Sequence, residues 1–459
     1  MRTMAGLGRL RGWLVAIVAM TLLAGLVLVS VPSAETSAPP VAASEPALSD
    51  PSSSEVAPNA NRAPAVRRDD RADAVRELLE RRASAVLRRD REAFLDTVDP
   101  LGETSFRTAQ GALFDNLDGL PFGEWRYTLD AGQALPPPAL PSGVPSADEL
   151  WAPKVELRYA FQGVDVVSTS RSMGYLFARR GGDWFLVSDT ALEPQGRRTW
   201  RGPWDFGPCQ AVRTRRGMVI GHPGNQSLAA AVARELDGAV AAVSEVWGDG
   251  WPERAVVLLP ETMIELQALV GPEFSVDGIA AVAVADRVDT RVGTVEGPRV
   301  VINPRTASRL SLTPLRVVLR HEITHVAARG VTVDGAPMWL TEGFADYVGY
   351  RTSGLAPAQA APELARRVRA GFLPDDLPGN RDFQTTGDRL DLAYQQSWSL
   401  AAYVAGRSGE ARLVRLYRRI ASAGPTDRST MDNMLAEELG VGRAELLEGW
   451  RSHLVATFR

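Results

Sequence analysis

The chain has 459 residues, with 51 Lys and Arg against 55 Asp and Glu, a net charge of -4 and a pI near 5.8. Nucleic-acid-binding domains normally carry concentrated positive charge, so this balance excludes a nucleic acid as the expected partner. The length allows two or three domains, each with its own core, and the single cysteine, Cys209, excludes an internal disulfide.

The first predicted element is an apolar segment at the amino terminus. Arg2, Arg9 and Arg11 precede an apolar stretch of 19 residues from Trp13 to Val31, close to the roughly 20 residues that cross a bilayer. We expect residues 1–34 to be either an uncleaved membrane anchor or a signal peptide cut near Ala34. The arginines before it favour an extracytoplasmic location for all that follows, whether anchored or secreted.

A linker and a first folded domain come next. Residues 35–69 are rich in Ala, Pro and Ser, which predicts a disordered linker. In residues 70–195 the apolar pattern predicts helices first and strands afterwards. The helices are expected over 72–87 and 94–98, the strands over 125–129 and 155–161, and a hairpin with arms 172–180 and 184–188 around Gly181-Gly182.

This order of helices before a curved antiparallel sheet is similar to the α+β cone of the nuclear-transport-factor-two-like proteins. The resemblance rests on element order and not on a motif. It implies a role in binding, oligomerisation or spacing rather than in catalysis, since a fold does not by itself imply an activity.

Residues 210–459 predict a second domain that begins as a mixed sheet and ends as helices. Strands are expected over 218–221, 255–259, 279–285 and 299–302, with helices over 228–246, capped by Ser227, and after Glu261. The strand over 279–285 is a candidate for an edge strand along a cleft, although an ordinary core strand would have the same apolar pattern. After Tyr350 helices are expected over 363–370, 394–406, 410–423, 431–439 and 443–458.

The motif His321-Glu322-x-x-His325 lies on a predicted helix that Thr313 caps and Gly330 ends. Residues four apart share one helix face, so both imidazoles can direct a ring nitrogen at one point. Glu322 projects at a different angle, where it can hold a water as a general base. A stray match on a solvated helix face is the alternative, but two of the four histidines of the chain fall in this motif.

Glu342 follows 17 residues after His325, on a second helix expected to begin near Pro337. Two imidazoles and one carboxylate are the ligand set of a catalytic zinc whose fourth position is open to water. Asp346, one turn beyond Glu342, is placed to accept the second ring proton of a ligand histidine.

Together these residues resemble the gluzincin metallopeptidases, and most closely the peptidase MA-like proteins of bacterial envelopes, over roughly residues 210–459. The resemblance implies that His321, His325 and Glu342 hold Zn²⁺, that Glu322 is the catalytic base, and that the substrate is a peptide or protein. It also implies a role for Tyr394, which is similar to the tyrosine that steadies the oxyanion in gluzincin aminopeptidases. The Lys-Gly that follows that tyrosine in the family is absent here, and simple packing of Tyr394 is the alternative.

A second departure from the family concerns the substrate. Gly278-Ile279-Ala280-Ala281-Val282 stands where the aminopeptidases have Gly-x-Met-Glu-Asn, so the glutamate that would pair with a free amino terminus is missing. We therefore expect endopeptidase rather than aminopeptidase activity. Two other functions stay open: an inactive envelope binding or scaffold protein with a vestigial metal site, and a zinc amidase that acts on the cell wall.

Overall fold

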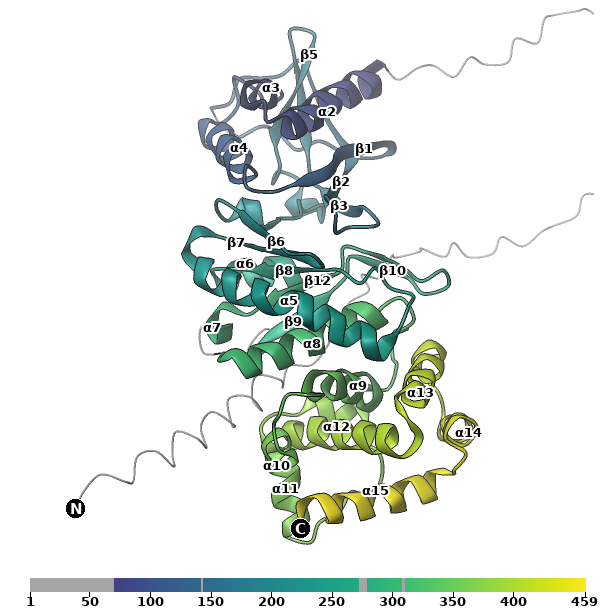
Figure 1. The fold of residues 1–459 in the computed structure, drawn as a ribbon. Helices are drawn as coiled ribbons and strands as arrows, with labels where there is room; N and C mark the ends of the chain where they lie inside the picture. The colour runs from purple at the N-terminus through teal and green to yellow at the C-terminus, as the bar shows by residue number, and fades with distance from the viewer. Residues whose placement is uncertain (1–69, 142, 272–278, 308–309) are drawn as a thin grey trace, which may run out of the picture.

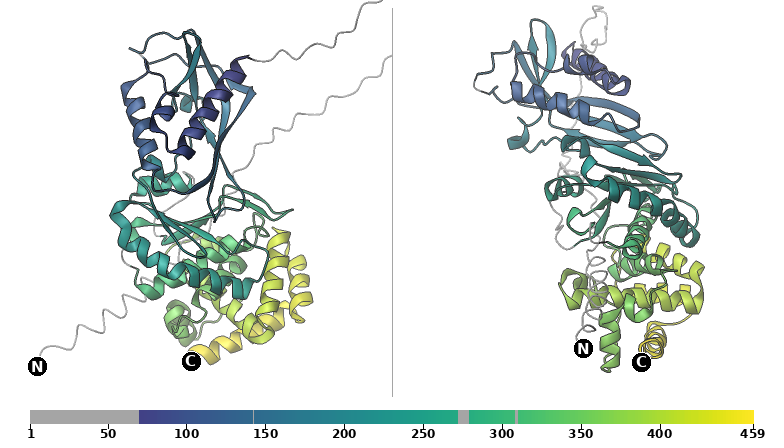
Figure 2. Two further views of the ribbon diagram at one scale, coloured as in Figure 1. Left: turned by 45° about the horizontal axis from the view of Figure 1, so that its top comes forward. Right: turned by 60° about the vertical axis from the view of Figure 1, so that its left-hand side comes forward.

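The computed structural model describes residues 70–141, 143–271, 279–307 and 310–459 (Figure 1). An N-terminal lobe lies at one end, a sheet with its covering helices in the middle, and a helical lobe at the other end, and the two further views agree (Figure 2). The predicted α+β class is confirmed. The apolar segment Trp13–Val31 and the linker 35–69 lie outside the described residues, and none of the described helices is long and apolar enough to cross a bilayer.

The N-terminal lobe packs helices against an antiparallel sheet. Its helices are α2 (Asp70–Arg88), α3 (Arg91–Leu95) and α4 (Thr104–Asn116), of which α4 is not among the predicted elements. Its strands are β1 (Phe122–Leu135), β2 (Glu149–Phe161), β3 (Thr169–Met173), β4 (Leu176–Arg180) and β5 (Asp183–Ser188). The strand order is β1-β2-β4-β5, and β3 also pairs with β2. The predicted order of helices before strands is confirmed, while the nuclear-transport-factor-two-like family stays a prediction.

The predicted hairpin arm over 172–180 is wrong in one respect, because it consists of two strands, β3 and β4. They are separated at Gly174, where a Cβ atom would lie 2.4 Å from the carbonyl oxygen of Arg197. The Gly174 N–H donates to Thr199 Oγ1 at 3.0 Å. The segment at Arg197–Thr199 therefore packs directly against Gly174, where the strand is interrupted. Because this contact joins residues far apart in the sequence, the local alternation of apolar residues does not predict it.

The central sheet has five strands in the order β6-β7-β8-β12-β9. Their bounds are β6 Gln210–Arg213, β7 Gly217–Gly221, β8 Ala255–Leu259, β12 Arg299–Ile302 and β9 Ala281–Val284. Strands β7, β8 and β12 are parallel, while β6 and β9 are antiparallel edge strands. The expected strand over 279–285 is thus shorter than predicted and lies at an edge. It is followed by a hairpin of β10 (Arg287–Asp289) and β11 (Thr294–Glu296).

Each face of the central sheet has a different cover. Val257, Val300 and Ala283 pack with α5 (Gln226–Trp247) and α8 (Leu312–Ala328) in one apolar core. Val256 and Val301 pack with α6 (Met263–Val270) and with apolar side chains of the N-terminal lobe in a second core. The N-terminal lobe is therefore part of the same packed body as the sheet.

Two predicted helix caps are wrong by two residues. The residue that precedes α5 is Asn225 and not Ser227, and the residue that precedes α8 is Ser311 and not Thr313. Neither makes a side-chain cap hydrogen bond. Several Ser, Thr and Asn residues lie near each start, and residue type alone does not decide among them.

The helical lobe contains the predicted C-terminal helices, of which two, α12 and α14, begin earlier than expected. Its helices are α9 (Met338–Tyr350), α10 (Pro357–Ala360), α11 (Pro362–Arg369), α12 (Asp388–Ser408), α13 (Glu410–Ala423), α14 (Arg428–Leu439) and α15 (Arg443–Phe458). A short α7 (Pro304–Ala307) precedes α8. The start of α9 after Pro337 is confirmed. Helix α12 begins six residues before Tyr394, so this tyrosine does not open its helix as predicted.

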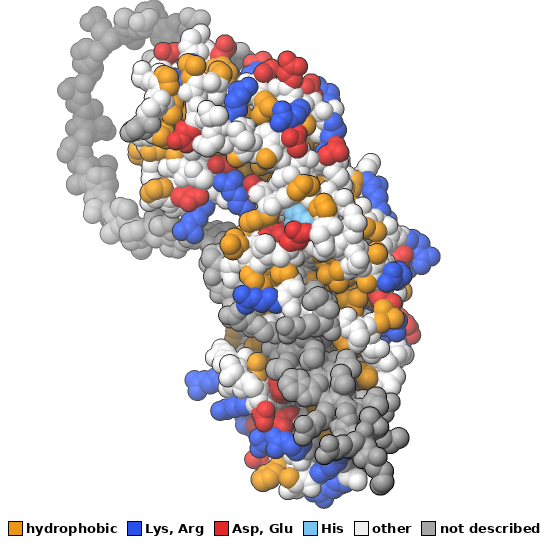
Figure 3. All heavy atoms as spheres, turned by 90° about the vertical axis from the view of Figure 1, so that its left-hand side faces the viewer, with side chains coloured by type: hydrophobic (Ala, Val, Ile, Leu, Met, Phe, Trp, Pro, Cys, Tyr) orange, Lys and Arg blue, Asp and Glu red, His pale blue; other side chains and the backbone are white. Residues whose placement is uncertain are grey.

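One face of the molecule illustrates the charge balance. In Figure 3 the basic and acidic side chains are interspersed over the described residues of that face. This face has no extended basic surface within its described part.

Two reciprocal ion pairs join the N-terminal lobe to the central sheet. Asp165 of the N-terminal lobe accepts from Arg299, the first residue of β12, at 2.7 and 2.8 Å. Arg171 of β3 pairs with Asp286, which lies between β9 and β10. The Asp165–Arg299 pair is almost completely buried, and the Arg299 guanidinium lies 5.2 Å from the centre of the Phe161 ring. The two ion pairs thus place one cation and one anion on each side of the junction: Arg171 and Asp165 in the N-terminal lobe, and Arg299 and Asp286 in the sheet.

We predict that Asp165→Ala lowers the free energy of unfolding by about 3–5 kcal/mol, because it leaves the buried Arg299 without its partner. Urea denaturation of the full chain, followed by circular dichroism, measures this change. Asp289→Ala is the matched control, since its pair with Arg291 is solvent-exposed, and it should leave the midpoint unchanged. Equal midpoints for the two variants would contradict the assignment of Asp165 as a joining residue.

Candidate metal centre

Helix α8 places His321, Glu322 and His325 at its inner surface. Apolar residues on other faces of the helix, including Leu315, Val318, Leu319 and Ile323, are buried in the core with α5. The two histidines are one turn apart, and their rings lie 4.8 Å apart between centres. All three motif side chains are buried, which fixes them by packing rather than leaving them on a solvated helix face.

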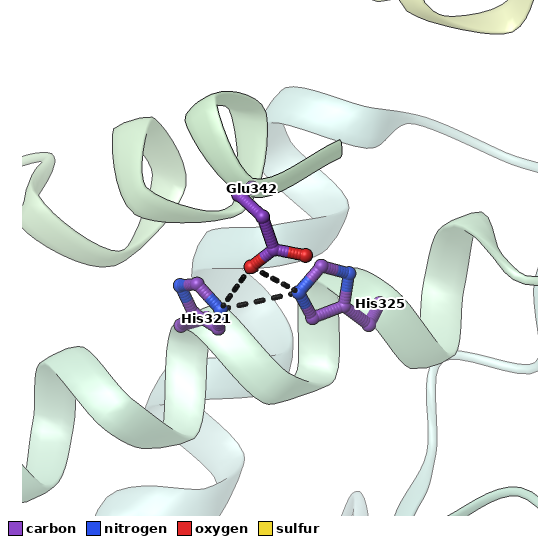
Figure 4. Close-up of side chains that lie close together, drawn as sticks. All are labelled: His321, His325 and Glu342. Atoms are coloured by element: carbon purple, nitrogen blue, oxygen red, sulfur yellow. Dashed lines mark hydrogen bonds and ion pairs between the residues drawn. The ribbon is translucent and has the colours of Figure 1, made fainter. Parts of the chain in front are cut away.

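Helix α9 brings Glu342 opposite these histidines (Figure 4). One carboxylate oxygen, Oε2, lies 3.5 Å from His321 Nε2 and 3.7 Å from His325 Nε2. The two Nε2 atoms are 3.1 Å apart. Three potential ligand atoms from two helices therefore form a triangle with sides of similar length.

The size of this triangle fits a tetrahedral zinc ion. Ligand atoms about 2.1 Å from such an ion are separated from each other by about 3.4 Å, which lies within the observed range of 3.1 to 3.7 Å. Glu342 is 0% exposed, and neither of its carboxylate oxygens has a hydrogen-bond partner among the described residues. The Oε2 atom of Glu342 faces the two imidazoles, and a cation placed among the three groups would be ligated by all of them. The residues present thus fit a Zn²⁺ ion, which is the cofactor expected for two imidazoles and one carboxylate.

Asp346 orients one of the histidines. Its Oδ1 accepts from His321 Nδ1 at 2.8 Å, and Asp346 lies one helical turn after Glu342 on α9. With the ring proton on Nδ1, the Nε2 atom of His321 directs its lone pair toward Glu342 and His325. The predicted bracing contact is therefore present in the structure.

The charges around Glu342 favour its ionised form. Burial raises the pKa of Glu342, but the positive charges of His325 and His321 outweigh burial and lower the pKa to about 2. For Asp346, burial raises the pKa more than the neighbouring His321 lowers it. Metal binding needs the ionised form of Glu342 and the neutral form of both imidazoles.

Two glycines of α9 let three helices approach closely at the centre. A Cβ atom on Gly343 would lie 2.5 Å from the carbonyl oxygen of Ser397 on α12. A Cβ atom on Gly349 would lie 3.1 Å from the carbonyl oxygen of Val317 on α8. A side chain at Gly343 would force α9 away from α12, and one at Gly349 would be a tight fit against α8, so the two glycines favour the close packing that brings Glu342 to the histidines.

Glu322 lies on α8, which packs beside the edge strand β9. The backbone N–H of Ala283 in β9 is among the groups near enough to lower the pKa of its carboxyl group. Burial raises the pKa of Glu322, and the two motif histidines and this N–H oppose the rise without cancelling it. A carboxylate with a raised pKa, next to the candidate metal position, has the properties of a general base.

Tyr394 lies on α12 beside the same group of carboxylates. It is 3% exposed, its hydroxyl group has no hydrogen-bond partner among the described residues, and its ring packs edge-on against Phe383 at 5.1 Å. Burial raises the pKa of Tyr394, and the charges of Glu342, Asp346 and Glu322 raise it further. The hydroxyl group therefore keeps its proton and is available as a donor.

The other histidines lie elsewhere. His222 is a buried side chain whose ring nitrogens contact the Pro208 carbonyl oxygen at 2.9 Å and Glu265 Oε1 at 2.8 Å. His453 lies on α15, where its ring packs against Tyr403 at 5.5 Å between centres. Both have the ordinary packing and hydrogen-bonding environments expected of histidines outside a metal site.

Sequence reasoning missed the backbone contribution of Ala283 and the close approach of Ser397 on α12 to Gly343. A backbone N–H has no side-chain signature, so no residue pattern could indicate it. Gly343, directly after Glu342, is a signal that could have indicated a close helix crossing.

No family model and no curated protein matches the chain. Among solved structures, a native yeast LTA4 hydrolase is 11% identical, and the match covers 61% of this chain and 43% of that one with a TM-score of 0.35. An M1 zinc metallopeptidase from Deinococcus radiodurans is 16% identical over 61% of this chain and 58% of its own, with a TM-score of 0.30. A mutant of that enzyme is 17% identical over 60% of this chain and 58% of its own, with a TM-score of 0.31.

The chain thus spans less than two thirds of the length of each of these proteins. At these identities and TM-scores the likeness by itself establishes neither the fold nor the activity of this chain.

We predict that Asp346→Ala weakens zinc binding by about 10- to 100-fold, because His321 loses the partner that orients its ring. Competition with a chromophoric zinc chelator measures the affinity of the full chain. Asp388→Ala, at the exposed start of α12, is the control and should bind zinc like the wild type. Unchanged affinity in Asp346→Ala would contradict the bracing role.

Proposed function

We propose that the chain is an extracytoplasmic zinc-dependent peptidase of the gluzincin type, with endopeptidase rather than aminopeptidase activity. The observation that carries the proposal is the buried triangle of His321, His325 and Glu342, whose carboxylate has no hydrogen-bond partner among the described residues. The neighbouring Glu322 and Tyr394 supply the proton acceptor and the donor that hydrolysis of an amide requires.

His321, His325 and Glu342 would hold the ion through one imidazole nitrogen each and a carboxylate oxygen. A zinc ion in such a set lowers the pKa of a bound water to about 7 and polarises a carbonyl group. The three side chains fill no more than three of the four positions of a tetrahedral ion, so one position is left for solvent or substrate.

Glu322 handles the proton in the proposed reaction. Its carboxylate takes a proton from the attacking water, which then adds to the carbonyl carbon of the substrate, and Glu322 returns this proton to the leaving amine. Its raised pKa makes the carboxylate a stronger base toward the attacking water, and the resulting carboxylic acid is still acidic enough to protonate an amine.

Tyr394 is proposed to stabilise the negative charge that develops on the carbonyl oxygen. Its hydroxyl group is buried, protonated and free of other partners among the described residues. A donor that is already positioned and desolvated needs no reorganisation when the charge forms.

Strand β9 supports the preference for internal peptide bonds. It lies at the edge of the central sheet, next to Glu322, where an extended substrate can add as a further strand. Its residues Ala281–Val284 carry no carboxylate that could pair with a free amino terminus. A chain that continues in both directions therefore suits this edge better than a chain that ends there.

The proposed location rests on the sequence alone. The segment Trp13–Val31 would act as a membrane anchor or a removed signal, and residues 70–195 would stand outside the cytoplasm with the peptidase domain. A peptide or protein is the proposed substrate.

We predict that Glu322→Gln lowers kcat by about 10²- to 10⁴-fold, because the amide cannot take a proton from water. Turnover of a quenched fluorescent peptide library and metal analysis of the same preparation measure activity and zinc content together. Zinc should stay at the wild-type level, and Glu437→Gln on the exposed surface of α14 should change neither quantity. Wild-type turnover in Glu322→Gln would show that another group acts as the base.

We also predict that Tyr394→Phe lowers kcat by about 10²- to 10³-fold with little change in KM, since a donor that acts in the transition state is lost. Tyr403→Phe serves as the matched control on the same helix, where the Tyr403 hydroxyl group accepts from Arg407. If both variants keep full kcat, Tyr394 has a packing role only.

A further inference from the structure

A pocket of about 180 Å³ lies at the junction of the N-terminal lobe and the central sheet. Its walls come from residues 164–167 of the N-terminal lobe, the segment that leads into β8, strands β11 and β12, and the end of α8. None of the described residues that line it belongs to β9 or to the candidate metal centre. The pocket is therefore a site of its own.

The greater part of the wall is apolar and large enough for one hydrocarbon group. Six valines line the pocket: Val164, Val166, Val167, Val256, Val295 and Val326. Val166 is 74% exposed although it lines the pocket, so the pocket opens to solvent at this residue. Apolar cavities of about 150 Å³ bind a benzene molecule, and the 180 Å³ of this pocket thus has room for one aryl or branched alkyl group.

The free polar atoms of the wall are hydrogen-bond donors. Trp251 and Arg299 both line the pocket, and Trp251 Nε1 and Arg299 Nε are buried without a hydrogen-bond partner among the described residues. The one carboxylate of the wall, Asp165, already accepts from Arg299 and from the Phe161 N–H. Because buried donors are normally satisfied, an occupant that supplies an acceptor complements this wall.

The charge of the wall favours an anionic acceptor. Arg254, an exposed residue of the wall, donates to the Gly163 carbonyl oxygen and forms no ion pair with the described residues. The ionisable groups of the wall are the guanidinium groups of Arg254 and Arg299 and the carboxylate of Asp165, which leaves one positive charge in excess. A carboxylate supplies two acceptor oxygens together with the opposite charge.

We infer that this pocket binds a small carboxylic acid that carries one aryl or branched alkyl group. The hydrocarbon group lies among the valines, and the carboxylate accepts from Trp251 and from the guanidinium group of Arg254. The bound acid contacts the N-terminal lobe and the sheet at once, so it stabilises their junction by mass action. The inference is independent of the proposed peptidase activity, because the pocket shares no described residue with the metal centre.

The test titrates the full chain, loaded with zinc, with 3-phenylpropionate in an isothermal titration calorimeter. We expect saturable binding with a Kd of about 1 mM or lower, which is ordinary for a ligand of this size. The alcohol 3-phenylpropan-1-ol lacks the charge and propionate lacks the ring. Each should bind at least about tenfold more weakly, because one loses a charged hydrogen bond and the other loses the buried ring. Equal affinities for the acid and the alcohol would overturn the assignment of a carboxylate.

Pocket variants connect the binding to this wall. Trp251→Phe keeps an aromatic wall without the Nε1 donor, and Val166→Asp places a negative charge at the mouth, so each should weaken binding of the acid by about tenfold or more. Arg254→Gln removes the exposed charge and should weaken binding about threefold. The matched controls are Arg234→Gln on α5 and Ile264→Asp on α6, two exposed residues outside the pocket, and both should bind the acid like the wild type. The variants of the exposed Val166 and Arg254 carry the test if Trp251→Phe fails to fold.

A separate measurement locates the acid, because a carboxylate can also coordinate zinc. Hydrogen exchange followed by mass spectrometry should show that 3-phenylpropionate slows exchange at residues 164–167 and 293–295. Protection confined to α8 around His321, or an affinity that all three pocket variants leave unchanged, would place the acid at the metal centre and refute the inference. Absence of saturable binding to the folded wild type would refute it as well, whether or not the chain cleaves peptides.

Discussion

The structure around α8 depends on one electrostatic constraint: two imidazole nitrogens and a carboxylate oxygen meet within 3.7 Å of each other in a buried environment. The three side chains could all ligate one cation, and neither oxygen of Glu342 is engaged in a hydrogen bond with the described residues. Particular residues of α9 allow the three groups to come together. Gly343 and Gly349 remove the side chains that would hold α9 away from α12 and α8, and Asp346 holds the ring of His321.

The N-terminal lobe is joined to this centre through the central sheet. Apolar residues of both parts form one core, and the pairs Asp165–Arg299 and Arg171–Asp286 cross the junction at β12 and just after β9. Because β9 lines the position of Glu322, the lobe that fixes the end of this strand also fixes one wall of the proposed cleft. Residues 164–167 of the lobe and the end of α8 line the same pocket at this junction.

Much of the secondary structure could be predicted from local patterns. Helices α2, α13 and α15 match their expected ranges within about two residues, because a buried stripe repeats every turn in each. The misses share a different cause. The break between β3 and β4 occurs where the segment at Arg197 crosses Gly174, and α12 extends two turns before Tyr394 through a polar stretch, Asp388 to Asp391, that lacks a strong apolar stripe. Long-range packing decided both, and a local window does not contain that information.

The sequence by itself determined the chemistry of the candidate site: His321, Glu322 and His325 have the spacing of one helix face, and Glu342 and Asp346 have the spacing of one turn on the next helix. These are local relations, which the geometry of an α-helix fixes. The tertiary structure decided what lies opposite those side chains: the distance from Glu342 to the two imidazoles, the Ala283 N–H at Glu322, the hydroxyl group of Tyr394, and the pocket between two lobes. Each of these brings together segments far apart in the chain, and their separation depends on how sheets and helices pack rather than on any repeat in the sequence.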